Sequence, residues 1–216
     1  MAEVIGDCVI FSDKSLQKPI GDLYAGAQVE ILEDFSAQAY KILENASNKI
    51  GWIHGKFLKI PAEAPTDKTV LSPRELECYV KTQAYTSNTN SLILADLNRQ
   101  KIHVFKWETD SQTWTYLKSF DCSTGLNASP TTRGIFTISA RGPWFYSERL
   151  SSGAKFWMRF NDQYLIHTIP MNRHMQIIPG EDIVGEKRSN GCIRLMPLDA
   201  KWLYENVPDG STIVII

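Results

Sequence analysis

A basic excess, long apolar runs and low-complexity tracts are all missing from this sequence of 216 residues. Lys and Arg total 23 against 24 Asp and Glu, and this net charge of −1 argues against a general nucleic-acid binder. No apolar run approaches the ~20 residues of a membrane span. Thirteen Gly and ten Pro are too few for a collagen-like or low-complexity chain. The composition that remains is that of a globular protein with one or two domains.

Cysteine is also scarce, and the four that occur match no zinc-ligand spacing. A disulfide framework is not expected in so long a chain with so few cysteines. We predict that Cys8, Cys78 and Cys122 are small buried hydrophobic residues. His167 and His174 find no third ligand at a credible spacing, so no metal site is predicted.

The other histidines are expected to be structural. His54 and His103 fall within strand patterns and are expected on strand surfaces, whereas His174 falls in the loop 171–180.

Short strands dominate the first 60 residues. Five segments of alternating or apolar character are separated by turn signals about every ten residues, which predicts a small β-barrel. Residues 61–68 contain two prolines and no large apolar residue, and are predicted to be a linker. The order Ser72, Pro73, Glu75 then predicts a helix start and a short helix to about Val80.

The β pattern returns over residues 91–168 and again at 211–216. Hairpins are predicted around residues 98–100 and within 144–160. Residues 197–207 form the best helical pattern, in which the apolar positions Leu198, Trp202, Leu203 and Val207 are predicted to share one face. The chain is therefore predicted to be mostly β, with domains at 1–60 and 91–216 joined by a linker and short helix at 61–90.

The residues with the clearest catalytic potential lie around Cys192. Gly191 allows a tight turn that exposes the thiol, and consecutive backbone N–H groups there suit an oxyanion hole. The same N–H groups, with Arg194 nearby, are expected to favour the thiolate. A free thiol is only a few per cent ionised at neutral pH, so a nucleophilic cysteine needs such help.

His167 is the candidate base for this cysteine. It ends an apolar strand, from which a side chain projects with a fixed direction. It would take the thiol proton and return it to a leaving amine. The backbone carbonyl of Thr168 is expected to hold the other ring nitrogen and so fix the tautomer.

These residues resemble the L,D-transpeptidase (YkuD-like) catalytic domain. The resemblance rests on His167 followed by residues 189–194 (SNGCIR), a hairpin at 93–105, the segment Ser123-Thr124-Gly125, and the loop and strand at 129–138. It covers about residues 90–216. Residues 21–29 and 51–58 resemble a bacterial SH3-like domain, a module that often accompanies cell-wall enzymes. The implied fold is a small SH3-like barrel followed by a transpeptidase-type β-sandwich with a few short helices.

The resemblance implies peptidoglycan chemistry without a cofactor. Cys192 would attack the carbonyl that joins the third stem residue to a terminal D-Ala, releasing D-Ala and forming a thioester. An amine of a second stem peptide would then produce a 3→3 cross-link. Water as the acceptor would make the protein an L,D-carboxypeptidase, which is the alternative. Carbapenem-type β-lactams, which acylate the family's cysteine, are expected inhibitors.

The resemblance also implies site roles. Besides Cys192 and His167, Gly191 would serve the oxyanion hole and turn, and Asn190, where most members have His, would donate a hydrogen bond. Substrate contacts are predicted for Ser189, Arg194, Trp157 and Tyr164. Arg194 would bind the donor's terminal carboxylate or shape the pocket.

The implied partners and location follow from the same resemblance. The expected partners are peptidoglycan stem peptides, with no nucleic acid, and the expected state is a monomer. The protein would be exported to the cell wall or periplasm. Residues 1–7 show neither a basic n-region nor an apolar h-region, so its export signal would lie outside this sequence. By themselves those residues fit a cytosolic protein equally well.

Three other interpretations compete. Sortases also use His, Cys and Arg, but their Arg lies several residues beyond the Cys, whereas Arg194 is two residues beyond Cys192. Papain-like endopeptidases place the Cys before the His, and here His167 precedes Cys192. A non-catalytic wall-binding protein stays open because Asn190 departs from the family pattern.

Overall fold

The computed structural model describes residues 1–35, 38–62 and 64–216. Its chain forms two compact units, one made of residues 1–64 with 125–132, and the other of residues 65–124 with 133–216. Strands predominate and the two α-helices are short, as the mostly-β prediction required. Within the described residues no helix has the length and apolar character to cross a membrane.

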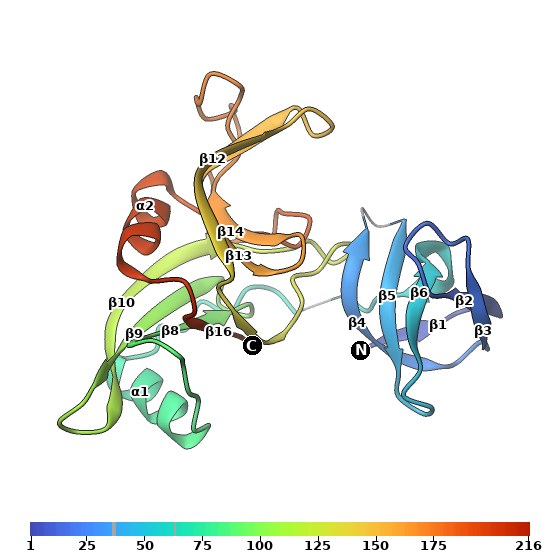
Figure 1. The fold of residues 1–216 in the computed structure, drawn as a ribbon, viewed down its shortest axis with the longest axis horizontal. Helices are drawn as coiled ribbons and strands as arrows, with labels where there is room; N and C mark the ends of the chain where they lie inside the picture. The colour runs from blue at the N-terminus through green and yellow to red at the C-terminus, as the bar shows by residue number, and fades with distance from the viewer. Residues whose placement is uncertain (36–37, 63) are drawn as a thin grey trace. The chain divides into compact units, whose positions relative to one another are not determined.

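The first unit is a seven-stranded antiparallel sheet in the order β3-β2-β6-β5-β4-β1-β7 (Figure 1). Alternation explains its core: in β2, Cys8 and Ile10 are buried while Val9 between them is exposed. The sequence predicted five strands here. The structure adds further short strands to the sheet, which the turn residues alone do not predict. The strands are β1 (Ala2–Val4), β2 (Cys8–Phe11), β3 (Pro19–Leu23), β4 (Gln28–Phe35), β5 (Ala39–Glu44), β6 (Ile50–His54) and β7 (Leu58–Lys59), with a 3-10 turn η1 (Gly55–Phe57) before β7.

A segment from much later in the chain completes the first unit. Residues 125–132, which connect two strands of the other unit, pack with residues 1–64. The Tyr40 hydroxyl donates to the Ala128 carbonyl, and the Thr132 hydroxyl donates to the Leu32 carbonyl at 3.1 Å. The Asn127 side-chain amide donates to the Ile60 carbonyl at 3.2 Å. No sequence signal indicated this association.

The second unit contains one nine-stranded sheet in the order β11-β16-β8-β9-β10-β15-β14-β13-β12. The sheet curls so that β11 at one end reaches β13, the strand next to the other end: the rings of Phe136 in β11 and Phe160 in β13 lie 5.7 Å apart. The strands are β8 (Ser91–Asp96), β9 (Lys101–Glu108), β10 (Thr113–Ser123), β11 (Gly134–Thr137), β12 (Ala140–Ser147), β13 (Ser152–Asn161), β14 (Tyr164–Thr168), β15 (Ile193–Leu195) and β16 (Thr212–Ile215).

Each helix of the second unit covers one face of this sheet (Figure 1). Helix α1 (Pro73–Thr82) starts with the predicted capping box between Ser72 and Glu75, and it packs Leu76 and Val80 against β8, β9 and β10. Helix α2 (Pro197–Asn206) packs on the other face, inside the curl. Both faces of the central strands are therefore buried.

Because both faces of the central strands are covered, the prediction that His103 lies on a strand surface is wrong. Its side chain lies on the α1 face of β9, only 4% exposed, because α1 covers the strands there. The ring Nδ1 lies 2.6 Å from the Ser119 hydroxyl, which also accepts from the Tyr116 hydroxyl. His54 is exposed, as predicted, and His174 in its loop is exposed as well.

Two further burial predictions were wrong. Leu198 is 81% exposed, since at about 100° per residue it lies roughly 200° around the axis from Ala200, which faces the core with Leu203. Cys78 is exposed on α1, whereas Cys8 and Cys122 are buried as predicted.

Candidate active site

The pairing of β14 with β15 brings the predicted base and nucleophile to one face of the sheet. The two strands are parallel, with Ile166 opposite Ile193 and His167 opposite Arg194. Both isoleucines are buried in the core, so their strand neighbours point to the other face. Cys192 precedes β15, and its sulfur is hydrogen-bonded by the backbone of Leu165, the residue two before His167. The sequence did not predict β15, which separates Cys192 from α2.

The His167 ring is held in its neutral form. Its Nδ1 lies 2.5 Å from the Thr168 carbonyl oxygen, the contact expected from the sequence. A carbonyl only accepts, so Nδ1 carries the hydrogen and Nε2 keeps its lone pair. Burial lowers the pKa of His167 to about 4, with the Arg194 charge acting in the same direction, against the Thr168 hydrogen bond, which raises it. The edge of Phe145 packs against the ring at a centroid distance of 5.7 Å.

Two buried histidines give the fold a defined response to acid. Burial lowers the pKa of both His103 and His167 from 6.5 to about 4. The unfolded chain therefore binds protons first, so stability present above pH 6.5 is lost as the pH falls toward 4, by up to about 3 kcal/mol per histidine. We expect urea titrations at pH 7 and pH 4.5 to show this loss, and to show about half of it in His103→Gln. An equal loss in both proteins would contradict it.

The turn before Cys192 is braced from inside. The Ser189 hydroxyl donates to the Cys192 carbonyl at 2.5 Å and accepts from the Gly191 N–H at 3.1 Å. Gly191 has φ +100°, and a Cβ there would lie 2.4 Å from the Tyr164 ring. The backbone N–H of Ser189 donates to the Thr124 carbonyl at 3.0 Å.

These contacts bear on three predicted roles. Ser189 and Tyr164 are about 1% exposed, so their side chains offer little surface for the predicted substrate contacts. The Gly191 N–H already donates to Ser189, so it is not free for an oxyanion. The turn function of Gly191 stands, because φ of +100° favours glycine.

The thiol is less ionised than the sequence suggested. Burial raises the pKa of Cys192, and it outweighs the Leu165 hydrogen bond and the Arg194 charge, which both lower it. Arg194 itself forms an ion pair with Glu181, with Nη1 2.8 Å from Oε2, and its Nε has no hydrogen-bond partner among the described residues. The sequence did not predict this role for Glu181. Its only signal was a charge opposite to that of Arg194, and it lies in a long loop.

The remaining predicted residues lie nearby on the sheet or the turn. Trp157 alternates with the core residue Met158 in β13, so it faces away from the core, and its indole lies against Gly142. Asn190 is exposed at the turn. In the part of the chain that the structure describes, no three His, Cys, Asp or Glu side chains group as metal ligands.

Comparison with known proteins gives the family. The model of the L,D-transpeptidase (YkuD) catalytic domain matches residues 90–216, more than half of the chain. The chain belongs to this L,D-transpeptidase family. Among curated relatives, the Bacillus subtilis (strain 168) protein named "Putative L,D-transpeptidase YciB" is 39% identical over 100 residues. That match covers 43% of this chain and 52% of YciB, so the chain spans about half the length of that relative.

Solved structures were also compared with the fold of this chain. A fused Zn-dependent amidase/peptidase/peptidoglycan-binding domain-containing protein from Clostridium acetobutylicum has a TM-score of 0.51 and 24% identity, covering 71% of this chain and 70% of its own. An L,D-transpeptidase from Stackebrandtia nassauensis has a TM-score of 0.46 and 22% identity, covering 61% and 58%. The first of these shows a similar fold over 71% of this chain.

Proposed function

We propose that this L,D-transpeptidase family member is a cysteine transpeptidase that forms 3→3 cross-links between peptidoglycan stems. One observation carries the proposal: the neutral His167 and the Cys192 thiol adjoin the same face of two paired strands. With Nδ1–H bound to the Thr168 carbonyl, Nε2 is the nitrogen that can take a proton. Family membership over residues 90–216 supplies the substrate class.

The first half-reaction releases D-Ala. Cys192 passes its proton to His167 as the sulfur attacks the carbonyl between the third stem residue and D-Ala. The negative oxygen that forms needs hydrogen-bond donors, for which we assign the Cys192 N–H because the Gly191 N–H is engaged. The C–N bond breaks, His167 returns the proton to the departing amine, and a thioester remains.

The second half-reaction transfers the acyl group. The side-chain amine of a second stem attacks the thioester, His167 accepts its proton, and the proton then neutralises the departing thiolate. Water in place of the amine gives the L,D-carboxypeptidase reaction.

The resting charge state follows from the two pKa directions. A raised thiol pKa and a lowered His167 pKa favour the neutral pair, so the proton moves only as the carbonyl is attacked.

Arg194 and Glu181 are proposed to set donor affinity. If Arg194 binds the terminal carboxylate of the donor, Glu181 competes for the same guanidinium. We expect Arg194→Met to raise KM for the tetrapeptide donor at least tenfold, and Glu181→Gln to lower it two- to fivefold, both measured by D-Ala release. A raised KM in Glu181→Gln would instead show that Glu181 positions Arg194.

The first unit is proposed to be an SH3-like wall-binding module of an exported, monomeric enzyme. The support is the resemblance of residues 21–29 and 51–58, together with an all-antiparallel sheet whose β2 buries alternate residues. A purely wall-binding protein is the second candidate, and its distinguishing property is an inert Cys192.

Mass spectrometry of the full chain incubated with disaccharide-tetrapeptide tests the proposed function. Loss of D-Ala with formation of cross-linked dimers is expected. Loss of D-Ala without dimers would indicate the carboxypeptidase. No product, and no adduct of a carbapenem on Cys192, would overturn the enzyme proposal in favour of the binding protein.

A further inference from the structure

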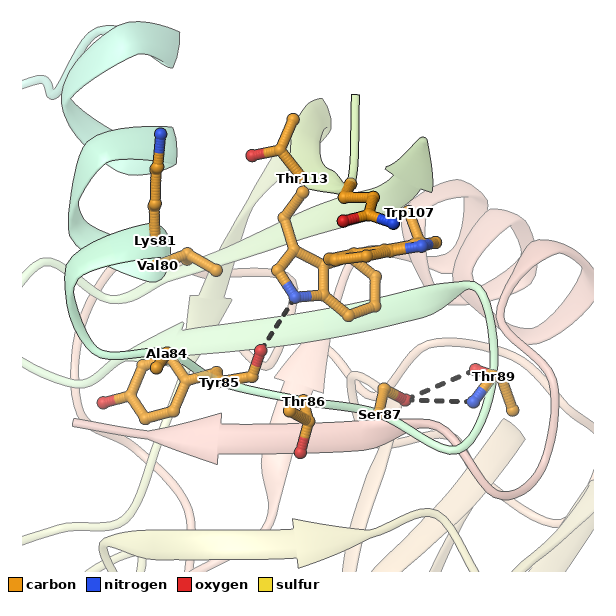
Figure 2. A pocket seen from close by; sticks show the side chains of 11 residues that line it. Val80, Lys81, Ala84, Tyr85, Thr86, Ser87, Thr89, Trp107 and Thr113 are labelled. Atoms are coloured by element: carbon orange, nitrogen blue, oxygen red, sulfur yellow. Dashed lines mark hydrogen bonds between the residues drawn. The ribbon is translucent and has the colours of Figure 1, made fainter. Parts of the chain in front are cut away.

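A second concave site lies in the second unit, where the end of α1 and the chain after it meet the β9–β10 hairpin. It is a pocket of about 360 Å³, a size within the range of small-ligand sites, roughly 300–1,000 Å³. Figure 2 shows Val80 and Lys81 toward one end, Trp107 toward the other, and Thr86 and Ser87 along the edge between them. None of the predicted catalytic residues lines it.

The floor of the pocket is a fixed aromatic platform. The Trp114 indole is 5% exposed, and its Nε1 donates to the Tyr85 carbonyl at 2.8 Å. Trp107 sits opposite Trp114 across the strand pair, with ring centroids 5.1 Å apart and planes at 68°. Trp107 is 36% exposed, so part of an indole faces solvent at the pocket wall.

The rim holds hydrogen-bonding groups that the protein does not use. The side chains of Thr86, Gln112 and Thr113 line the pocket and make no hydrogen bond to another described residue. Ser87 and Thr89, by contrast, are engaged: the Ser87 hydroxyl accepts from the Thr212 N–H at 2.9 Å, and the Thr89 hydroxyl lies 2.8 Å from that of Ser211. The Ser87 and Thr89 side chains are thus held in place by the protein, whereas the other three side chains are available to bind a ligand.

The charge of the lining residues further limits the kinds of ligand that fit the pocket. Lys81 is the one charged residue among those that line the pocket, and it forms no ion pair with another described residue. A cationic ligand is therefore disfavoured, and a neutral or acidic one fits. Because the two indoles stand nearly perpendicular, they leave no parallel slot for a flat aromatic ring.

We propose that this pocket binds a saccharide, specifically the chain of N-acetylated amino sugars to which the stem peptides are attached. The electron-rich face of Trp107 suits the C–H face of a pyranose ring, and the free hydroxyl and amide groups suit its polar edge. The sugar class depends on the geometry of the pocket, whereas the identity of the chain rests on the proposed function. The site would hold the glycan strand at a distance from the catalytic turn, since Trp114 and Ser123, which pairs with Arg194, lie nine residues apart on β10, about 30 Å along the strand.

Titration of the 15N-labelled full chain with chitotetraose, a soluble β-1,4-linked N-acetylglucosamine oligomer, tests the proposal without requiring catalysis. The chain has six tryptophans, so six indole N–H signals are available, and a Trp107→Phe variant assigns that of Trp107. We expect the Trp107 signal to shift saturably. We also expect the apparent affinity to fall at least tenfold in Trp107→Ala and at least threefold in Gln112→Ala, a surface change that leaves the platform intact.

The contrary outcomes are distinct. Signal shifts confined to Trp52 would place sugar binding in the first unit. Shifts confined to Trp144 or Trp157 would place it on β12 and β13, near His167. Either result overturns the proposal. A larger response to adenosine than to chitotetraose would make the ligand a flat aromatic and also overturn it. No shift at all, with D-Ala release from disaccharide-tetrapeptide intact, would reject the sugar site while the proposed function stands.

Discussion

Replacement of Cys192 by alanine is expected to reduce D-Ala release from disaccharide-tetrapeptide by at least a factor of 1,000, to the level of the buffer. The sulfur forms the bond to the acyl group, and alanine offers no nucleophile in its place. Cys192 is partly exposed and its thiol contacts the Leu165 backbone, so the fold should survive the change. Mass spectrometry of products measures the loss, and thermal unfolding checks that the variant stays folded.

Cys78→Ala is the matched control for this experiment. Cys78 is exposed on α1, so its removal should leave both turnover and unfolding unchanged. Turnover that persists in Cys192→Ala would refute the cysteine mechanism, and turnover lost equally in Cys78→Ala would mean that the assay reports folding.

Substitution of Gly191 by alanine is expected to cost on the order of 2–4 kcal/mol of stability and at least 100-fold in turnover. Two effects add. A backbone φ of +100° disfavours any side chain, and the new Cβ would lie 2.4 Å from the Tyr164 ring, which is buried and cannot withdraw. The turn would shift, and with it the direction of the Cys192 thiol. Chemical denaturation and D-Ala release measure the two losses.

Gly180→Ala separates the cost of a positive φ from the cost of a steric clash with the Tyr164 ring. Gly180 also has a positive φ, +82°, but a Cβ there meets nothing within 4 Å. We expect it to lose about 1 kcal/mol of stability and to retain turnover within twofold. If Gly191→Ala behaves like Gly180→Ala, the contact with Tyr164 does not fix the turn.

Local patterns were enough to predict much of the fold. The capping box at Ser72 fixed the start of α1, which ends at Thr82, two residues past the predicted Val80. Apolar segments around residues 98–100 located the hairpin β8–β9, and the aromatic-rich stretch 144–160 indicated the hairpin β12–β13. They failed where a distant element decides burial, as at His103, which α1 covers, and at Leu198, whose helix turns another side to the core.

The candidate site likewise has features that local sequence predicts and features that it does not. His167 and its Thr168 contact depend on neighbouring residues, so a strand end was sufficient to suggest them. The partner of Arg194, the brace of Ser189 and the raised pKa of Cys192 depend on burial and on residues far away in the chain, which no spacing reveals. For this reason the sequence indicated the chemistry at Cys192 better than its electrostatics.

Residues 125–132 bear on how such a protein can change over evolution. They lie inside the span that matches the family domain, yet their hydrogen bonds run to Leu32, Tyr40 and Ile60 of the first unit. A gene fusion that exchanged residues 1–64 for another module would leave this loop without its acceptors and donor. Exchange of residues 1–64 for another module is therefore expected to require a compensating change in the loop between β10 and β11.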